Sequence, residues 1–126
     1  HITAHQAYAL YQQGKLFLLD VHKRKGRKSG ERGSIVGSYY INPDMLSKMR
    51  LKLPKNKYIG VFWEWGEYEG FSLGACAQLR KKGYNNAIVI KNGYRAMREV
   101  GFVFHHPDGY LAKKNPITGE LTKFGD

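Results

Sequence analysis

Three short runs of mostly apolar residues stand along the chain, at 16–21, 58–63 and 87–90. A continuous apolar run, without the alternation of a half-exposed strand, is typical of a strand that is covered on both faces in a parallel sheet. Residues 37–41 predict a further, shorter strand. The pattern therefore predicts a parallel sheet with helices on both of its faces.

Between the apolar runs, apolar side chains recur at the spacing of a helix. Thr3 is a capping residue just before the first such segment, and Gly14 stops it. The strict alternation of strand and helix implies parallel pairing through right-handed crossovers. The helices predicted in this way span residues 4–13, 45–49, 71–82 and 94–100.

The length of the chain limits it to one domain. Its 126 residues, 42% of them hydrophobic, suffice for one modest core. We expect this domain to span 1–103, and 104–126 to form a C-terminal extension, either a hairpin or an arm against the body, because it contains two turn-forming segments. No stretch approaches the roughly 20 apolar residues of a membrane span. The sequence leaves two questions undecided. One is whether an upstream targeting segment has been removed, since the chain starts at His1, and the other is whether the compartment is periplasmic or cytoplasmic.

The charge of the chain is strongly positive, with 21 Lys and Arg against 10 Asp and Glu and a net charge of +11. Such an excess attracts acidic proteins, anionic lipid head groups and polyphosphates. The basic residues are densest at 23–28, which we interpret as a solvated basic loop. The alternative is that this run contacts nucleic acid or an anionic surface, but no accompanying nucleic-acid-binding module supports it.

Several short motifs, in order along residues 2–103, resemble the landmarks of the rhodanese family. The resemblance implies a rhodanese-like α/β fold, with a central parallel sheet flanked by helices on both faces, and sulfur transfer through a cysteine. The segments that carry it are Leu-Leu-Asp-Val at 18–21, resembling a strand that ends in Asp-Val-Arg, Gly-Ser-Ile-Val-Gly-Ser at 33–38, resembling the Gly-His-Ile-Pro-Gly-Ala turn, residues 53–57 and 79–86, and Asn-Gly-Tyr-Arg-Ala-Met at 92–97, resembling Gly-Gly-x-x-Ala-Trp.

The sequence departs from that family at the catalytic position. The resemblance places the sulfur-carrying cysteine at the end of the second buried strand, in a loop whose backbone N–H groups favour a thiolate. By strand register this position is Trp63, and an indole cannot carry a persulfide sulfur. His22 and Ser34 stand where the family has an arginine and a histidine. These losses predict a catalytically inactive domain with a remodelled site.

The loop that follows Trp63 looks longer than the family's and contains three glutamates, which disfavour an anionic substrate there. Its aromatic and acidic side chains suit a cationic group, a basic protein segment or a metal ion, although no recognised calcium-loop spacing is present. The alternative is that Trp63 and Trp65 fill the vacated pocket while the glutamates face water. The predicted binding residues are His22, Trp63, Glu64, Trp65, Gly66, Glu67, Tyr68, Glu69 and Gly70.

Cys76 is the only thiol, which excludes an intramolecular disulfide and a multi-cysteine metal site. It falls inside a predicted helix, on the face shared with Ala75 and Leu79, so we interpret it as a buried, inert thiol. His105 and His106 would point to opposite faces of a strand, which disfavours a shared metal ion. The sequence predicts no cofactor and no metal site.

Three functional hypotheses follow from these observations. The favoured one is a non-catalytic binding or accessory module that engages an acidic protein partner or small ligand at the carboxyl ends of the parallel strands, alone or within a larger complex. The alternative is a thiosulfate sulfurtransferase that uses Cys76. The third is nucleic-acid or anionic-surface binding through residues 23–28.

Overall fold

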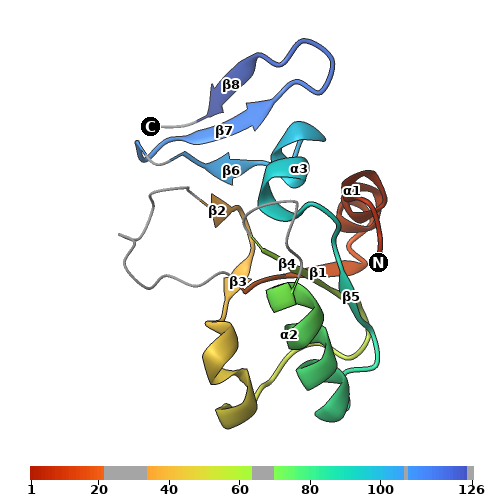
Figure 1. The fold of residues 1–126 in the computed structure, drawn as a ribbon. Helices are drawn as coiled ribbons and strands as arrows, with labels where there is room; N and C mark the ends of the chain where they lie inside the picture. Colours follow the sequence, from red (N-terminus) through yellow and green to blue (C-terminus); the bar gives the residue numbers. More distant parts are fainter. Residues whose placement is uncertain (22–33, 64–69, 107, 125–126) are drawn as a thin grey trace.

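The computed structural model describes residues 1–21, 34–63, 70–106 and 108–124. Its centre is a parallel sheet of four strands in the order β3-β1-β4-β5 (Figure 1). The predicted parallel sheet is therefore confirmed. Its strands are β1 (Leu16–Asp20), β3 (Tyr39–Tyr40), β4 (Tyr58–Phe62) and β5 (Ala87–Val89).

Helices cover both faces of the parallel sheet, as predicted (Figure 1). On one face lie α1 (Ala4–Gln12) and α3 (Gly93–Glu99), and on the other lie α2 (Gly70–Lys81) and the short 3-10 helix η1 (Pro43–Lys48). None of the described helices is both long and apolar enough to cross a membrane.

The first helix begins where the sequence predicts it. The Gln6 N–H donates to the Thr3 hydroxyl (3.1 Å), and the Thr3 N–H donates to the Gln6 side-chain oxygen (2.9 Å). This reciprocal capping box satisfies two backbone donors that a helix start leaves unpaired. Cap and first turn therefore follow from local sequence alone.

Residues next to each other in β1 and β4 enter different cores. Leu19 and Val61 belong to the cluster under α2 and η1, whereas Leu18 and Phe62 belong to the cluster under α1 and α3. All four are at most 2% exposed. This burial on both faces explains why the strands are continuously apolar rather than alternating.

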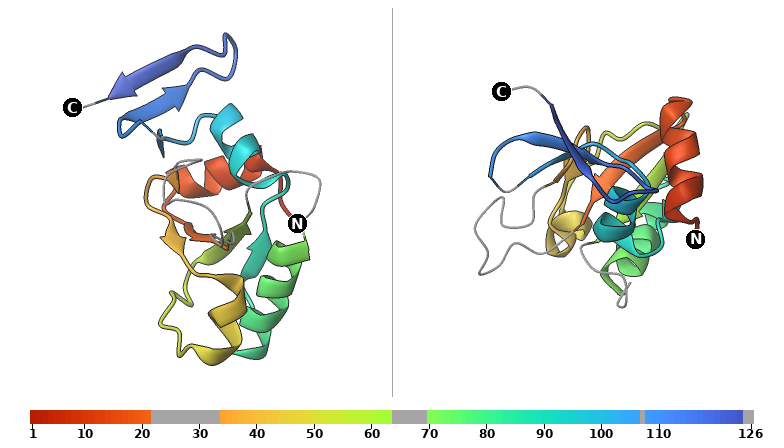
Figure 2. Two further views of the ribbon diagram at one scale, coloured as in Figure 1. Left: turned by 60° about the vertical axis from the view of Figure 1, so that its left-hand side comes forward. Right: turned by 90° about the horizontal axis from the view of Figure 1, so that it is seen from above.

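A second, antiparallel sheet adjoins the helix pair α1 and α3 (Figure 2). Its inner strand β2 (Ser34–Ile35) pairs with β6 (Phe104–His105), and β6 pairs with β7 (Leu111–Lys114). The outer strand β8 (Leu121–Phe124) completes a hairpin with β7. The sequence pattern predicts a hairpin or an arm in this region. It does not predict the pairing of β6 with β2, because two-residue strands are too short to show an alternating pattern.

Residues of the extension take part in the main core. Phe104 and Ala112 are fully buried in the same cluster as Leu18 and Phe102. The Lys113 ammonium group of the extension lies 5.9 Å from the centre of the Tyr8 ring of α1. The extension thus shares apolar contacts with the body of the molecule.

Candidate functional site

The carboxyl ends of β1 and β4 lie side by side at one edge of the parallel sheet. Asp20 is paired with Phe62 in the strand register, and the Val21 N–H donates to the Phe62 carbonyl (3.0 Å). Trp63 directly follows Phe62, so it lies at the same edge as Asp20, whose side chain is buried. In open α/β sheets this edge is the usual place for a binding site.

The start of α3 holds the backbone at Trp63. The Tyr94 N–H donates to the Trp63 carbonyl oxygen, and this hydrogen bond is short, at 2.7 Å. Gly93 has a φ of +55°, and a Cβ atom on it would lie 2.0 Å from the same oxygen. Only glycine fits where the helix approaches the strand end so closely. Sequence patterns do not predict this contact, because Trp63 and Gly93 are far apart along the chain.

Most of the predicted binding residues cannot be placed in this site. Trp63 is described, with a partly buried side chain, and Gly70 is the first residue of α2. His22 and the basic run 23–28 lie outside the described residues. The same is true of Glu64, Trp65, Gly66, Glu67, Tyr68 and Glu69, so their binding role stays a prediction.

Cys76 is buried, as predicted, in the core cluster on the α2 side of the sheet. Tyr94 of α3 belongs to the cluster on the opposite side. The thiol therefore lies under a different face of the sheet from the helix that holds the Trp63 carbonyl. Cys76 and Trp63 therefore do not form one catalytic centre.

Burial raises the pKa of the Cys76 thiol from 9.0 to about 11, against a smaller lowering by the Arg80 guanidinium. A rise of this size leaves roughly a hundredfold less thiolate at neutral pH. Because the folded state favours the neutral thiol, its contribution to stability is fully present below pH 9.0 and is lost as the pH rises through about 11. Such a thiol is a poor nucleophile at neutral pH.

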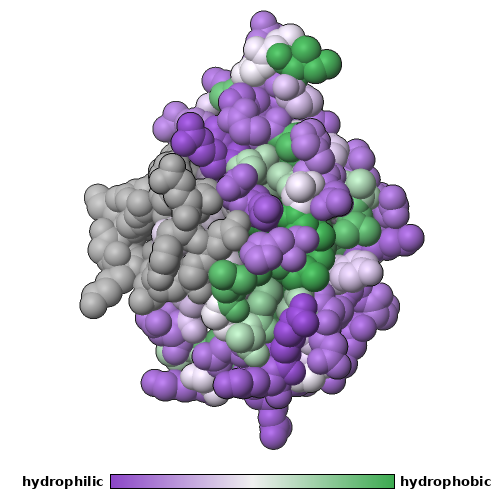
Figure 3. All heavy atoms as spheres, turned by 45° about the vertical axis from the view of Figure 1, so that its right-hand side comes forward, coloured by the Kyte–Doolittle hydropathy of each residue, from purple (hydrophilic) through white to green (hydrophobic). Residues whose placement is uncertain are grey.

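A small pocket of about 280 Å³ reaches Cys76 from the outer edge of β5. Its rim includes Leu73 and Arg80 of α2, and the Arg80 guanidinium donates to the Ala87 carbonyl (2.9 Å). Figure 3 shows apolar side chains gathered near the middle of the face that carries α1 and β5, with hydrophilic ones around them. This pocket is lined by neither Asp20 nor Trp63, so it is separate from the strand-end site.

The adjacent histidines have different surroundings. His105 is exposed, whereas the His106 ring stacks on Tyr110 with centroids 4.4 Å apart. The His106 Nδ1 accepts a hydrogen bond from the Asp108 N–H (3.1 Å). Within the part of the chain that the structure describes, no three His, Cys, Asp or Glu side chains gather as metal ligands do.

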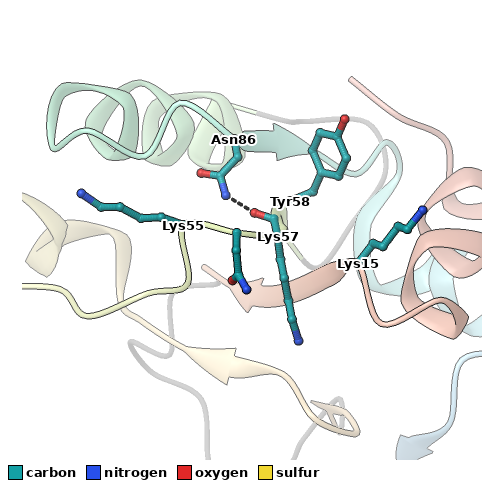
Figure 4. A pocket seen from close by; sticks show the side chains of 6 residues that line it. Lys15, Lys55, Lys57, Tyr58 and Asn86 are labelled. Carbon is teal, nitrogen blue, oxygen red and sulfur yellow. Dashed lines mark hydrogen bonds between the residues drawn. The ribbon is translucent and has the colours of Figure 1, made fainter.

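The structure also reveals a basic hollow that the sequence reasoning missed. It has a volume of about 450 Å³ and lies where the parallel strands begin (Figure 4). Trp63 follows β4 at the opposite edge of the sheet. A signal was present, since Lys15 and Lys57 each directly precede a predicted strand, and starts of parallel strands meet at one edge. The lining residues are Lys15, Lys55, Asn56, Lys57, Tyr58 and Asn86.

The chain is similar to solved structures, although its sequence matches neither a family model nor a curated protein. No family model matches the chain. No curated protein matches it significantly. Solved structures do match: the Alr3790 protein from Anabaena is 21% identical over 82% of this chain and 79% of that one, with a TM-score of 0.65. A solution structure from the same protein, with a TM-score of 0.61, is described as a rhodanese-like domain.

Two further structures extend this similarity. The human single-domain sulfurtransferase TSTD1 is 22% identical over 76% of this chain and 91% of its own, with a TM-score of 0.61. The BH2092 protein from Bacillus halodurans is 14% identical, with a TM-score of 0.62, and the match covers 100% of this chain and 84% of that one. The chain therefore has the rhodanese-like α/β fold. At these identities the similarity establishes the fold and not an activity.

Proposed function

We propose that this chain is a rhodanese-like domain without sulfurtransferase activity, which binds a protein partner at the carboxyl edge of its parallel sheet. The basic surface of the rest of the chain steers it toward a partner of acidic overall charge. The observation that carries the proposal is the separation of the only thiol from that edge. Cys76 is buried on the side of α2 that faces the sheet, while Trp63 follows the end of β4, where the family resemblance places the reactive cysteine.

The chemistry of sulfur transfer supports this proposal. The attacking group in such a reaction is a thiolate, which has to reach the sulfur of the donor. Cys76 is 7% exposed, and its raised pKa keeps it protonated at neutral pH. Trp63 has no ionisable or nucleophilic atom to take its place.

The electrostatics of the chain support an acidic partner. A net charge of +11 on 126 residues creates a field that accelerates encounters with negatively charged proteins. The partly buried Trp63 offers an aromatic anchor at the strand ends, and such anchors often dominate the energy of an interface. Field and anchor together suit a protein interface better than a small anionic substrate.

The absence of activity is directly measurable. In a thiosulfate-to-cyanide assay, we expect wild-type chain and Cys76→Ser to give the same background rate. After incubation with thiosulfate, intact mass should show no gain of a sulfur atom on Cys76. Alkylation of Cys76 in native and denatured chain serves as a companion check on its burial. Turnover or a persulfide that disappears in Cys76→Ser would make the chain a sulfurtransferase and end this proposal.

The binding half of the proposal is tested with Trp63→Ala as bait in affinity capture. We expect Trp63→Ala to retain on the order of tenfold less of an acidic protein partner than the wild type, because the substitution removes the aromatic anchor. Tyr58→Ala is the matched control, since it removes an exposed aromatic ring at the opposite edge of the sheet. Capture by the wild type should fall between about 50 and 300 mM salt as charges are screened. If the amount of captured partner is unchanged in Trp63→Ala, or is unchanged by added salt, the proposed interface is contradicted.

A further inference from the structure

The basic hollow at the amino edge of the parallel sheet is built by three separate elements. Lys15 directly precedes β1, Lys57 directly precedes β4 and Asn86 directly precedes β5. Because parallel strands begin at the same edge, these residues meet although they are distant in the sequence (Figure 4). The hollow is thus a consequence of the fold and not of one flexible loop.

Backbone hydrogen bonds fix the floor of the hollow. The Tyr58 N–H donates to the Lys15 carbonyl, and the Ile59 N–H donates to the Asn86 carbonyl, both at 3.0 Å. The Asn86 side-chain amide donates to the Lys57 carbonyl (Figure 4). These bonds join all three strand starts, so the backbone that forms the floor of the hollow is held in place before any ligand arrives.

The segment that leads into β4 is anchored as well. The Tyr84 hydroxyl donates to the Leu51 carbonyl (2.8 Å) and accepts from the Leu53 N–H (3.2 Å). The Lys55 ammonium group lies 5.3 Å from the centre of the Tyr84 ring. One buried tyrosine therefore positions the segment that delivers Lys55 to the rim of the hollow.

The positive charge of the hollow has no opposite charge beside it among the residues that the structure describes. Among the described residues, no carboxylate lines the hollow or forms a salt bridge with Lys15, Lys55 or Lys57. Three lysines line one concave surface, and their positive charge raises the local concentration of anions. The hollow is therefore suited to a negatively charged ligand.

The arrangement of the lysines selects a ligand with several linked anionic groups. Figure 4 shows Lys15, Lys55 and Lys57 extending in different directions from the rim, so one small anion cannot contact all three. A volume of about 450 Å³ is in the range of small-molecule sites. An added peptide strand is disfavoured, because the Tyr58 and Ile59 N–H groups are already bonded within the sheet.

We propose that this hollow binds a linear oligophosphate, either free or as the phosphate chain of a nucleotide. Its linked phosphates reach lysines on separate sides of the hollow, and the Asn56 amide offers a further donor. The Tyr58 ring, 48% exposed, lines the hollow and offers a face on which a nucleobase stacks. This site is independent of the partner-binding edge at Trp63.

The test is isothermal titration of the full chain with sodium tripolyphosphate and, separately, with ATP. We expect single-site binding of tripolyphosphate that weakens between about 50 and 300 mM salt. The double variant Lys15→Gln/Lys57→Gln should bind on the order of tenfold more weakly, because two phosphate contacts are lost. ATP that binds more tightly than tripolyphosphate, with the gain lost in Tyr58→Ala, identifies a nucleotide; equal affinities identify a free phosphate chain.

The matched control is Lys91→Gln/Lys123→Gln, which removes the same charge at two exposed positions outside the hollow. We expect it to bind tripolyphosphate as the wild type does. Equal weakening in both double variants would show that only the overall field matters and would overturn the site. Absence of saturable binding, or a poly-glutamate peptide that binds the hollow more tightly than tripolyphosphate, would overturn it too.

Discussion

Replacing Gly93 with alanine is expected to destabilise the fold by about 3 kcal/mol or more, which lowers the melting temperature by roughly 10 °C. The new Cβ atom would lie 2.0 Å from the Trp63 carbonyl oxygen and 2.9 Å from its carbon. To relieve this overlap, α3 has to move away from β4, which breaks the 2.7 Å hydrogen bond from Tyr94 to Trp63. Thermal unfolding followed by circular dichroism measures the effect.

Gly14→Ala is the matched control for this prediction. Gly14 also has a positive φ, +71°, but nothing lies within 4 Å of the position that its Cβ atom would take. It should cost only the backbone strain of a left-handed alanine, about 1–2 kcal/mol. If the two variants unfold at the same temperature, crowding against Trp63 is not what requires glycine at position 93.

Phe104→Ala is expected to cost about 3–5 kcal/mol, the range for removing a large aromatic side chain from a core. Phe104 is fully buried in the cluster that also contains Leu18 and Phe102. The Arg98 guanidinium lies over its ring, 4.2 Å from the centre, so the substitution also removes a cation–π contact. Urea unfolding of wild type and variant gives the difference in free energy.

Phe124→Ala provides the same chemical change in the same extension. Phe124 is 40% exposed on the outer strand β8, so its loss should cost no more than about 1 kcal/mol. A large difference between the variants would show that residues 104–126 stabilise the domain. Equal small effects would instead support the proposed division into a domain over 1–103 and a separable extension.

The candidate site could be predicted only in part. Strand register along 58–63 placed Trp63 at the end of a buried strand, and helical spacing placed Cys76 on a buried face. Neither signal shows that the Cys76 thiol lies on the α2 side of the sheet while the Trp63 carbonyl is bonded to α3, which lies on the other side. The basic hollow was equally hidden, because Lys15, Lys55 and Asn86 come together only when three strands pair in parallel.

The sequence by itself determined the local features: continuously apolar strands, a capped first helix, helix ends at glycines and a tryptophan at the end of the second buried strand. These features depend on neighbours within a few residues, which periodicity and capping chemistry describe well. The tertiary structure alone decided the pairing of β2 with β6, the contact of Gly93 with Trp63 and the meeting of lysines at the amino edge. The physical reason is that these contacts join residues far apart in the chain, where close packing and strand pairing, and not local propensity, determine which atoms meet.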